Sequence, residues 1–216
     1  MGAALLVGVH RALDTLAARF PGGSRGNRNL TGLLGALLLA GILGELGTLA
    51  LGLQRTLPWH IAVGIGLIPV VVLKLGSTGW RMVRYYTGAP GYRAEGPPRP
   101  FLRAIAPVVA GSTLALLGSG VGLVAVGPGP GSQLFRAVHG ASFAIFLLVV
   151  GVHALAHLPK LRRLAFADWG RGRPHGHALR RTLVAFSLVA GGSAAFASLQ
   201  FVGPWLTAVR HGLVGG

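Results

Sequence analysis

The amino-acid sequence predicts an all-α membrane protein, a polytopic bundle of five transmembrane helices preceded by an N-terminal amphipathic helix. Apolar residues make up 52% of its 216 residues and charged residues only 11%, whereas soluble domains are about one-quarter charged. The chain therefore has too few charged side chains to cover a water-facing surface. Five apolar stretches have the roughly 20 residues that a helix needs to cross a bilayer; they span residues 33–53, 57–75, 104–126, 137–158 and 183–203.

The segment before the first span differs from the others because polar residues interrupt it. Leu5, Leu13 and Leu16 recur at helical spacing, while His10 and Arg11 fall on other faces. This pattern is typical of an amphipathic helix on a membrane surface and not of a cleavable signal peptide. We expect residues 1–30 to form this interfacial segment, residues 31–205 the helical bundle and residues 206–216 an external tail.

The basic residues predict the orientation, because Lys and Arg accumulate on the cytoplasmic side of a membrane. Sixteen of the 20 fall in the N-terminal segment, the loop after the second span and the loop after the fourth. The opposite side has Arg55, Arg136 and Arg210, and Lys74 lies inside the second span. We expect a cytoplasmic N-terminus and an external C-terminus in a bacterial inner membrane. Topology thus accounts for the formal charge of +16, which argues against a nucleic-acid partner.

Composition also limits the chemistry of the chain. It has no cysteine, which excludes disulfides, thiolate zinc sites, iron–sulfur clusters and a cysteine nucleophile. It has only four acidic residues, and no Ser-His-Asp arrangement, paired carboxylates or phosphate loop supports hydrolysis.

The connecting segments have their own patterns. Residues 88–100 are rich in proline and glycine and predict an extended loop, and residues 162–181 predict a basic, polar loop whose His175 and His177 are solvated. Gly118, Gly120 and Gly122 lie inside a span and are expected to be helix-packing positions.

Histidines inside the spans are the main functional signal. His60 lies near the start of the second span, and His139, His153 and His157 lie on the fourth. Ionisable residues at membrane depth usually face a bundle interior or a site. Fourteen residues separate His60 from Lys74 and also His139 from His153, which brings a side chain back to within about 40° of the same face. We expect His60 and His139 at an outer level and Lys74 and His153 at an inner level.

Two histidines at equal depth on neighbouring helices can hold one flat haem between them, since neutral imidazole is an axial ligand of haem iron. Gly64 and Gly140, beside these histidines, would leave room for a porphyrin. The alternative is that the histidines are polar side chains bonded to the backbone or to one another in a helix bundle. The level-matched pair favours at least one haem b, and a second haem is left open.

The sequence leaves the roles of Lys74, His157 and Glu45 open. Lys74 can extend to lipid headgroups, pair with a haem propionate or bind iron as a neutral amine. His157 can lie at the interface, contact a propionate or act as a ligand. Glu45, in the middle of the first span, is either protonated and bonded to a neighbour or marks a proton or quinol site.

The segments that carry these histidines also suggest a family. The WH dipeptide at residues 59–60, KLGSTGWR at 74–81, and the stretch from HGASF to HALAH at 139–157 resemble bacterial b-type cytochromes of the cytochrome b561-like kind. The resemblance covers roughly residues 33–165. It looks closest to the membrane module that accompanies a sulfite-oxidase-like molybdopterin domain.

The resemblance implies a helical bundle that binds haem b and passes electrons between a quinone pool and a redox partner. It carries the ligand histidines over to His60, His139 and His153, whereas Lys74 stands where a symmetrical di-haem cytochrome has histidine. A molybdopterin oxidoreductase partner is expected to be a separate protein. The alternative function is that of a haem-free membrane anchor, an assembly subunit or a small proton or ion transporter.

Overall fold

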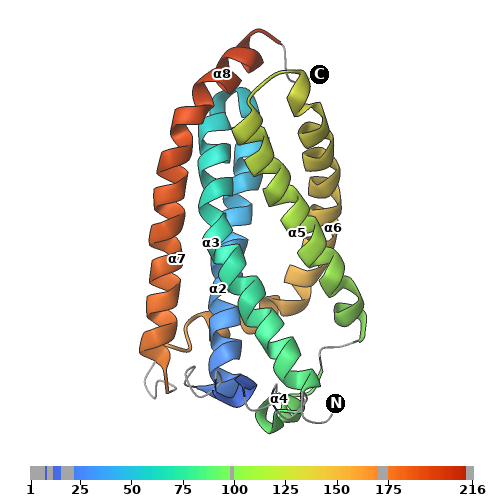
Figure 1. Cartoon of the computed structure of the whole chain (residues 1–216), viewed down its shortest axis with the longest axis vertical. Coiled ribbons are helices and arrows are strands. Elements are labelled where there is room, and N and C mark those ends of the chain that lie inside the picture. The colour runs from blue at the N-terminus through green and yellow to red at the C-terminus, as the bar shows by residue number, and fades with distance from the viewer. Residues whose placement is uncertain (1–7, 9–11, 16–21, 98–99, 170–174, 213–216) are drawn as a thin grey trace.

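The computed structural model describes residues 8, 12–15, 22–97, 100–169 and 175–212, and these residues form helices and turns without strands. Five helical segments are long and apolar enough to cross a membrane, as the sequence predicts. Figure 1 shows the helices that form them: α2 (Gly23–Ala50), α3 (Leu53–Tyr86), α5 (Pro100–Val126), α6 (Gln133–Ala165) and α7 (His177–Ser198). Most of the expected N-terminal amphipathic helix lies outside the described residues.

Helix α2 begins at Gly23, within the segment 1–30 that we expected to be interfacial. Its first turns carry polar side chains that bond to neighbouring elements. The side-chain amide of Asn27 donates to the Ser77 carbonyl at 3.1 Å, and that of Asn29 donates to Asp168 Oδ1 at 3.3 Å. Because these groups have partners, the helix extends beyond its apolar stretch.

The prediction of an extended loop over residues 88–100 is wrong in part, because this segment contains the short helix α4 (Pro90–Ala94). Pro90 occupies the first helical position, where its missing N–H costs no hydrogen bond. Gly96, with φ of 72°, follows the helix in a left-handed conformation that suits glycine.

The expected loop 162–181 is shorter in the structure, since α6 extends to Ala165 and α7 begins at His177. At the other end of α7, the turn η2 (Leu199–Phe201) leads into α8 (Val202–Arg210). Helix α8 therefore takes up part of the expected tail 206–216.

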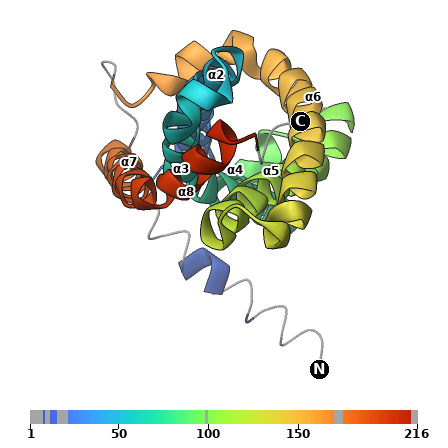
Figure 2. The ribbon, with the colours of Figure 1, turned by 90° about the horizontal axis from the view of Figure 1, so that it is seen from above.

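Seen along the bundle, α2, α3, α5 and α6 lie around a common axis, and α7 packs on the outside against α3 (Figure 2). Leu34 and Val70 are buried with Val184 where α2, α3 and α7 meet. Gly191 of α7 faces the backbone of Gly66 on α3 and leaves no room for a Cβ, so these two helices approach closely. Large apolar side chains such as Phe186 and Phe196 remain exposed, as expected for helices that face lipid.

The two ends of the bundle differ in their number of basic side chains. The basic end is where α2, α5 and α7 begin and where α3 and α6 finish. It carries most of the arginines of the described residues, whereas Arg55, Arg136 and Arg210 lie at the opposite end. The distribution is the one expected from the sequence.

Candidate functional site at the end opposite the basic end

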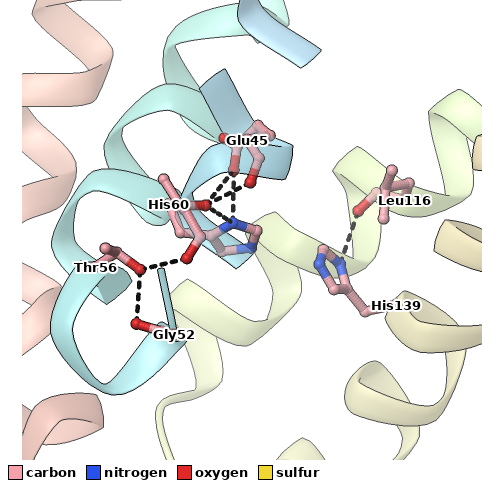
Figure 3. Close-up of polar contacts among 7 residues, drawn as sticks. Glu45, Gly52, Thr56, His60, Leu116 and His139 are labelled. Atoms are coloured by element: carbon pink, nitrogen blue, oxygen red, sulfur yellow. Dashed lines mark hydrogen bonds and ion pairs between the residues drawn. The ribbon is translucent and has the colours of Figure 1, made fainter. Parts of the chain in front are cut away.

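The imidazoles of His60 on α3 and His139 on α6 face one another near the end of the bundle opposite the basic end. Their ring centroids are 6.2 Å apart and their planes are nearly perpendicular, at 88°. Figure 3 shows the two side chains pointing toward each other from separate helices. This placement agrees with the expectation that the two rings share one level.

The Nδ1 atom of each ring is held by protein groups. His60 Nδ1 lies 2.5 Å from Glu45 Oε2 and 3.3 Å from Thr48 Oγ1. His139 Nδ1 lies 3.1 Å from the Leu116 carbonyl oxygen and 3.2 Å from Ser119 Oγ. Within the described residues, no protein group hydrogen-bonds to the Nε2 atom of either ring. Both rings therefore have a fixed orientation and a nitrogen available to a ligand.

The tight connection between α2 and α3 explains how Glu45 reaches His60. Only Leu51 and Gly52 separate the two helices, and Gly52 has a φ of 89°, which suits glycine. Thr56 Oγ1 donates to the carbonyls of Thr48 at 2.7 Å and of Gly52 at 2.9 Å. These bonds fasten the start of α3 to the end of α2, so residues on either side of the turn lie at similar depth.

The two rings lie close enough for one metal ion to bind between them. With metal–nitrogen bonds of about 2.1 Å and a ring nitrogen about 1.1 Å from its ring centre, two imidazoles that share one metal ion would have centroids at most about 6.4 Å apart. The observed 6.2 Å is close to this value. Helix α6 packs mainly on α5 and α2, whereas α3 packs mainly on α2 and α7, so the two imidazoles meet between helices that are not principal packing partners.

Three glycines near the pair have different surroundings. A Cβ at Gly120 would lie 3.3 Å from His139 Cε1, so this glycine gives the ring its space. A Cβ at Gly64 would lie 3.4 Å from Glu45 Oε1, and one at Gly140 would meet no atom within 4 Å. There is open space beside Gly140, whereas Gly64 faces the Glu45 carboxylate. Two imidazoles, each with its Nδ1 held by protein groups, are donors of the kind that haem iron accepts.

The side chains expected at the inner level have a different geometry. Lys74 Nζ donates to the Thr31 carbonyl at 2.5 Å. His153 stacks on His157 of the same helix, with centroids 4.4 Å apart and planes 24° from parallel, and His153 Nδ1 is buried without a partner in the described part of the chain. Because the stacked rings face each other, they cannot take opposite sides of one metal ion. Lys74 and His153 are near enough to interact electrostatically, but no opposed pair of imidazoles forms here.

The pairing of Glu45 with His60 was not found from the sequence, which left Glu45 without a partner. Both residues lie a short distance along the sequence from the Gly52 turn, and this closeness could have predicted their pairing. Ser119 and the Leu116 carbonyl were also missed. Of the three expected packing glycines, Gly120 faces His139 and Gly122 faces the Phe135 ring, whereas Gly118 has nothing within 4 Å.

No group of three or more histidine or acidic residues is placed to hold a metal ion in the described ranges, and His175 and His177 are thus not part of one. No protein-family model matches the chain, and no characterised protein or solved structure is significantly similar to it. The resemblance to cytochrome b561-like proteins therefore stays an expectation from the sequence.

Proposed function

We propose that the chain is a membrane-integral b-type cytochrome subunit that transfers electrons between a quinone pool and a separate redox protein. The observation that carries the proposal is the pair of opposed imidazoles of His60 and His139, 6.2 Å apart. Both Nδ1 atoms bond to protein groups. In metal-bound histidines the second ring nitrogen commonly makes such a bond, which fixes the tautomer and the ring orientation.

Bound haem would supply a reversible one-electron carrier inside the membrane. His60 and His139 would hold the haem, and Glu45 would accept the His60 Nδ1–H bond. Ser119 and the Leu116 carbonyl would orient His139. Glu45 is the charged group that contacts the pair directly.

A single haem is favoured over two. Lys74 Nζ donates to the Thr31 carbonyl, so this amine already has a protein partner. His153 has only the stacked His157 as a neighbouring imidazole. In this proposal Lys74 and His153 lie closer to the basic end than the haem does, and they do not ligate it.

The partners are proposed from the sequence resemblance. Quinone is the proposed membrane-soluble electron carrier, and a molybdopterin oxidoreductase is the proposed redox protein. The subunit itself would carry electrons without catalysing the partner's reaction. The orientation in a bacterial inner membrane, with the basic end in the cytoplasm, is part of the same proposal.

A dithionite-reduced minus oxidised absorption spectrum of the purified protein tests the proposal. We expect a b-type signal and extraction of the pigment by acidified acetone, because the chain has no cysteine for thioether bonds. A protein that shows no Soret band after expression with ample haem would contradict the proposal. That result would favour a haem-free anchor, assembly subunit or small proton or ion transporter.

A further inference from the structure

A groove on one flank of α7 at the basic end lies far from the paired histidines. It has a volume of about 480 Å³ and lies between α7 and Trp169 of the segment that follows α6. In Figure 1, α7 begins at the same end of the molecule as α2. The groove is lined by Trp169, Arg181, Thr182, Val184, Ala185 and Leu188.

The polar and apolar walls of this groove are arranged along the helix. Arg181 and Thr182 belong to the first turns of α7, at the basic end, whereas Ala185 and Leu188 follow one and two turns deeper into the span. The Arg181 guanidinium lies 5.3 Å from the centre of the Trp169 ring, which is a cation–π distance. The groove thus has a cationic mouth at the membrane surface and an apolar floor in the membrane.

No carboxylate in the described part of the chain pairs with Arg181. The chain has only four acidic residues, and each one is bonded elsewhere. Asp14 pairs with Arg84, Glu45 with His60, Glu95 with Arg28 and Arg81, and Asp168 with Arg180. An anion that neutralises Arg181 must therefore come from outside the protein.

We propose that this groove binds an anionic phospholipid, with its phosphate at Arg181 and Thr182 and an acyl chain along Ala185 and Leu188. Guanidinium groups bind phosphate oxygens through paired N–H donors. Basic pockets beside transmembrane helices bind lipid headgroups of this charge, and tryptophan favours the level of the headgroups. A membrane supplies a ligand that is anionic at one end and apolar at the other.

Competition between two lipids in detergent tests the proposal. The purified protein is given equal amounts of phosphatidylglycerol and phosphatidylcholine with the same acyl chains, and bound lipid is counted by native mass spectrometry. We expect the wild type to retain phosphatidylglycerol preferentially. Arg181→Gln should lower its retention about fivefold.

Arg163→Gln is the matched control, because Arg163 lies in the last turn of α6 at the same basic end but does not line the groove. It should retain lipid like the wild type. Ala185→Trp keeps the charge of Arg181 but fills the apolar floor, and it should also lose the lipid. Haem content is measured on the same samples and should be unchanged, so the outcome is independent of the proposed electron transfer.

Three results would overturn the proposal. The first is equal lipid retention by the wild type and Arg181→Gln. The second is an equal loss of lipid in Arg163→Gln, which would indicate diffuse surface charge. The third is displacement of the lipid by millimolar inorganic phosphate, which would indicate a simple anion site. Each variant is first checked for a wild-type elution profile in gel filtration. If Ala185→Trp fails to fold, the comparison of Arg181→Gln with Arg163→Gln alone decides whether the groove binds the lipid.

Discussion

The carboxylate of Glu45 on α2 lies 2.5 Å from Nδ1 of His60 on α3, and both side chains are largely buried, with 18% and 25% of their surface exposed. A carboxylate that accepts the Nδ1–H bond fixes the imidazole and makes its other nitrogen a stronger electron donor. Glu45 is therefore placed to tune any metal that His60 binds.

The charge of Glu45 is expected to lower the reduction potential of the haem. Glu45→Gln keeps an oxygen acceptor for His60 but removes the charge, so the ferric state loses stabilisation. The midpoint potential should rise by about 60 mV, the one-electron equivalent of a tenfold change in relative affinity for the two iron states. Redox titration followed at the Soret band measures this shift. An unchanged potential with full haem content would show that Glu45 has no electrostatic role.

The two facing histidines should both be needed for haem binding. His60→Ala and His139→Ala should each abolish the b-type spectrum, because each removes one of the two proposed haem ligands. His153→Ala and Lys74→Met should leave the haem content per chain unchanged. Haem is quantified against protein after gel filtration, so a misfolded variant is recognised. A wild-type content near two per chain that falls to about one in His153→Ala would contradict the single-haem proposal.

The space beside His139 gives a second test that leaves the ligands intact. Gly120→Val places a branched side chain against His139 Cε1, since a Cβ alone would lie 3.3 Å from that atom. We expect weaker haem retention, by about tenfold or more. Gly118→Val is the control, because a Cβ there meets no atom within 4 Å and the change in helix propensity is the same. Equal haem loss in both variants would point to a general effect on α5.

A buried ion pair at the basic end should contribute strongly to stability. Arg180 and Asp168 are only 5% and 3% exposed, and Arg180 Nε lies 2.7 Å from Asp168 Oδ2. Asp168→Asn leaves the arginine charge without its counter-charge, and it should lower the free energy of unfolding by about 3–5 kcal/mol. Thermal unfolding followed by circular dichroism measures the loss.

Glu95→Gln serves as the comparison for this ion pair, because its partners Arg28 and Arg81 are 39% and 30% exposed. It should cost about 1 kcal/mol or less. If the two substitutions are equally mild, the buried pair is not a main stabilising contact.

The orientation can be checked with reporters that are active only outside the cytoplasm. A fusion after Gly216 should be active and an insertion near Gly172 silent, because basic loops stay in the cytoplasm. The reverse pattern would exchange the inner and outer sides of the bundle. The geometry of the histidine pair would not change.

The sequence was sufficient for the helices because apolar length is itself the physical requirement for crossing a bilayer. It was also sufficient to place His60 and His139 at one level, since both lie near the start of spans with the same direction. It was not sufficient for α4, where Pro90 starts a helical turn within a segment whose proline and glycine content suggested an extended chain. The partners of Glu45 and Lys74 depend on which helix faces which, and hydrophobicity does not encode this information.

The depth of the histidine pair has an electrical consequence. At about 1.5 Å per residue, His60 lies about 10 Å along α3 from Leu53, whereas the whole helix of 34 residues measures about 51 Å. His139 lies similarly near the start of α6. Carrying one charge across the entire membrane field involves about 2.3 kcal/mol per 100 mV. If haem binds here as proposed, an electron exchanged between it and the nearer aqueous face would cross only a small part of that field, so its transfer rate should be nearly independent of membrane voltage.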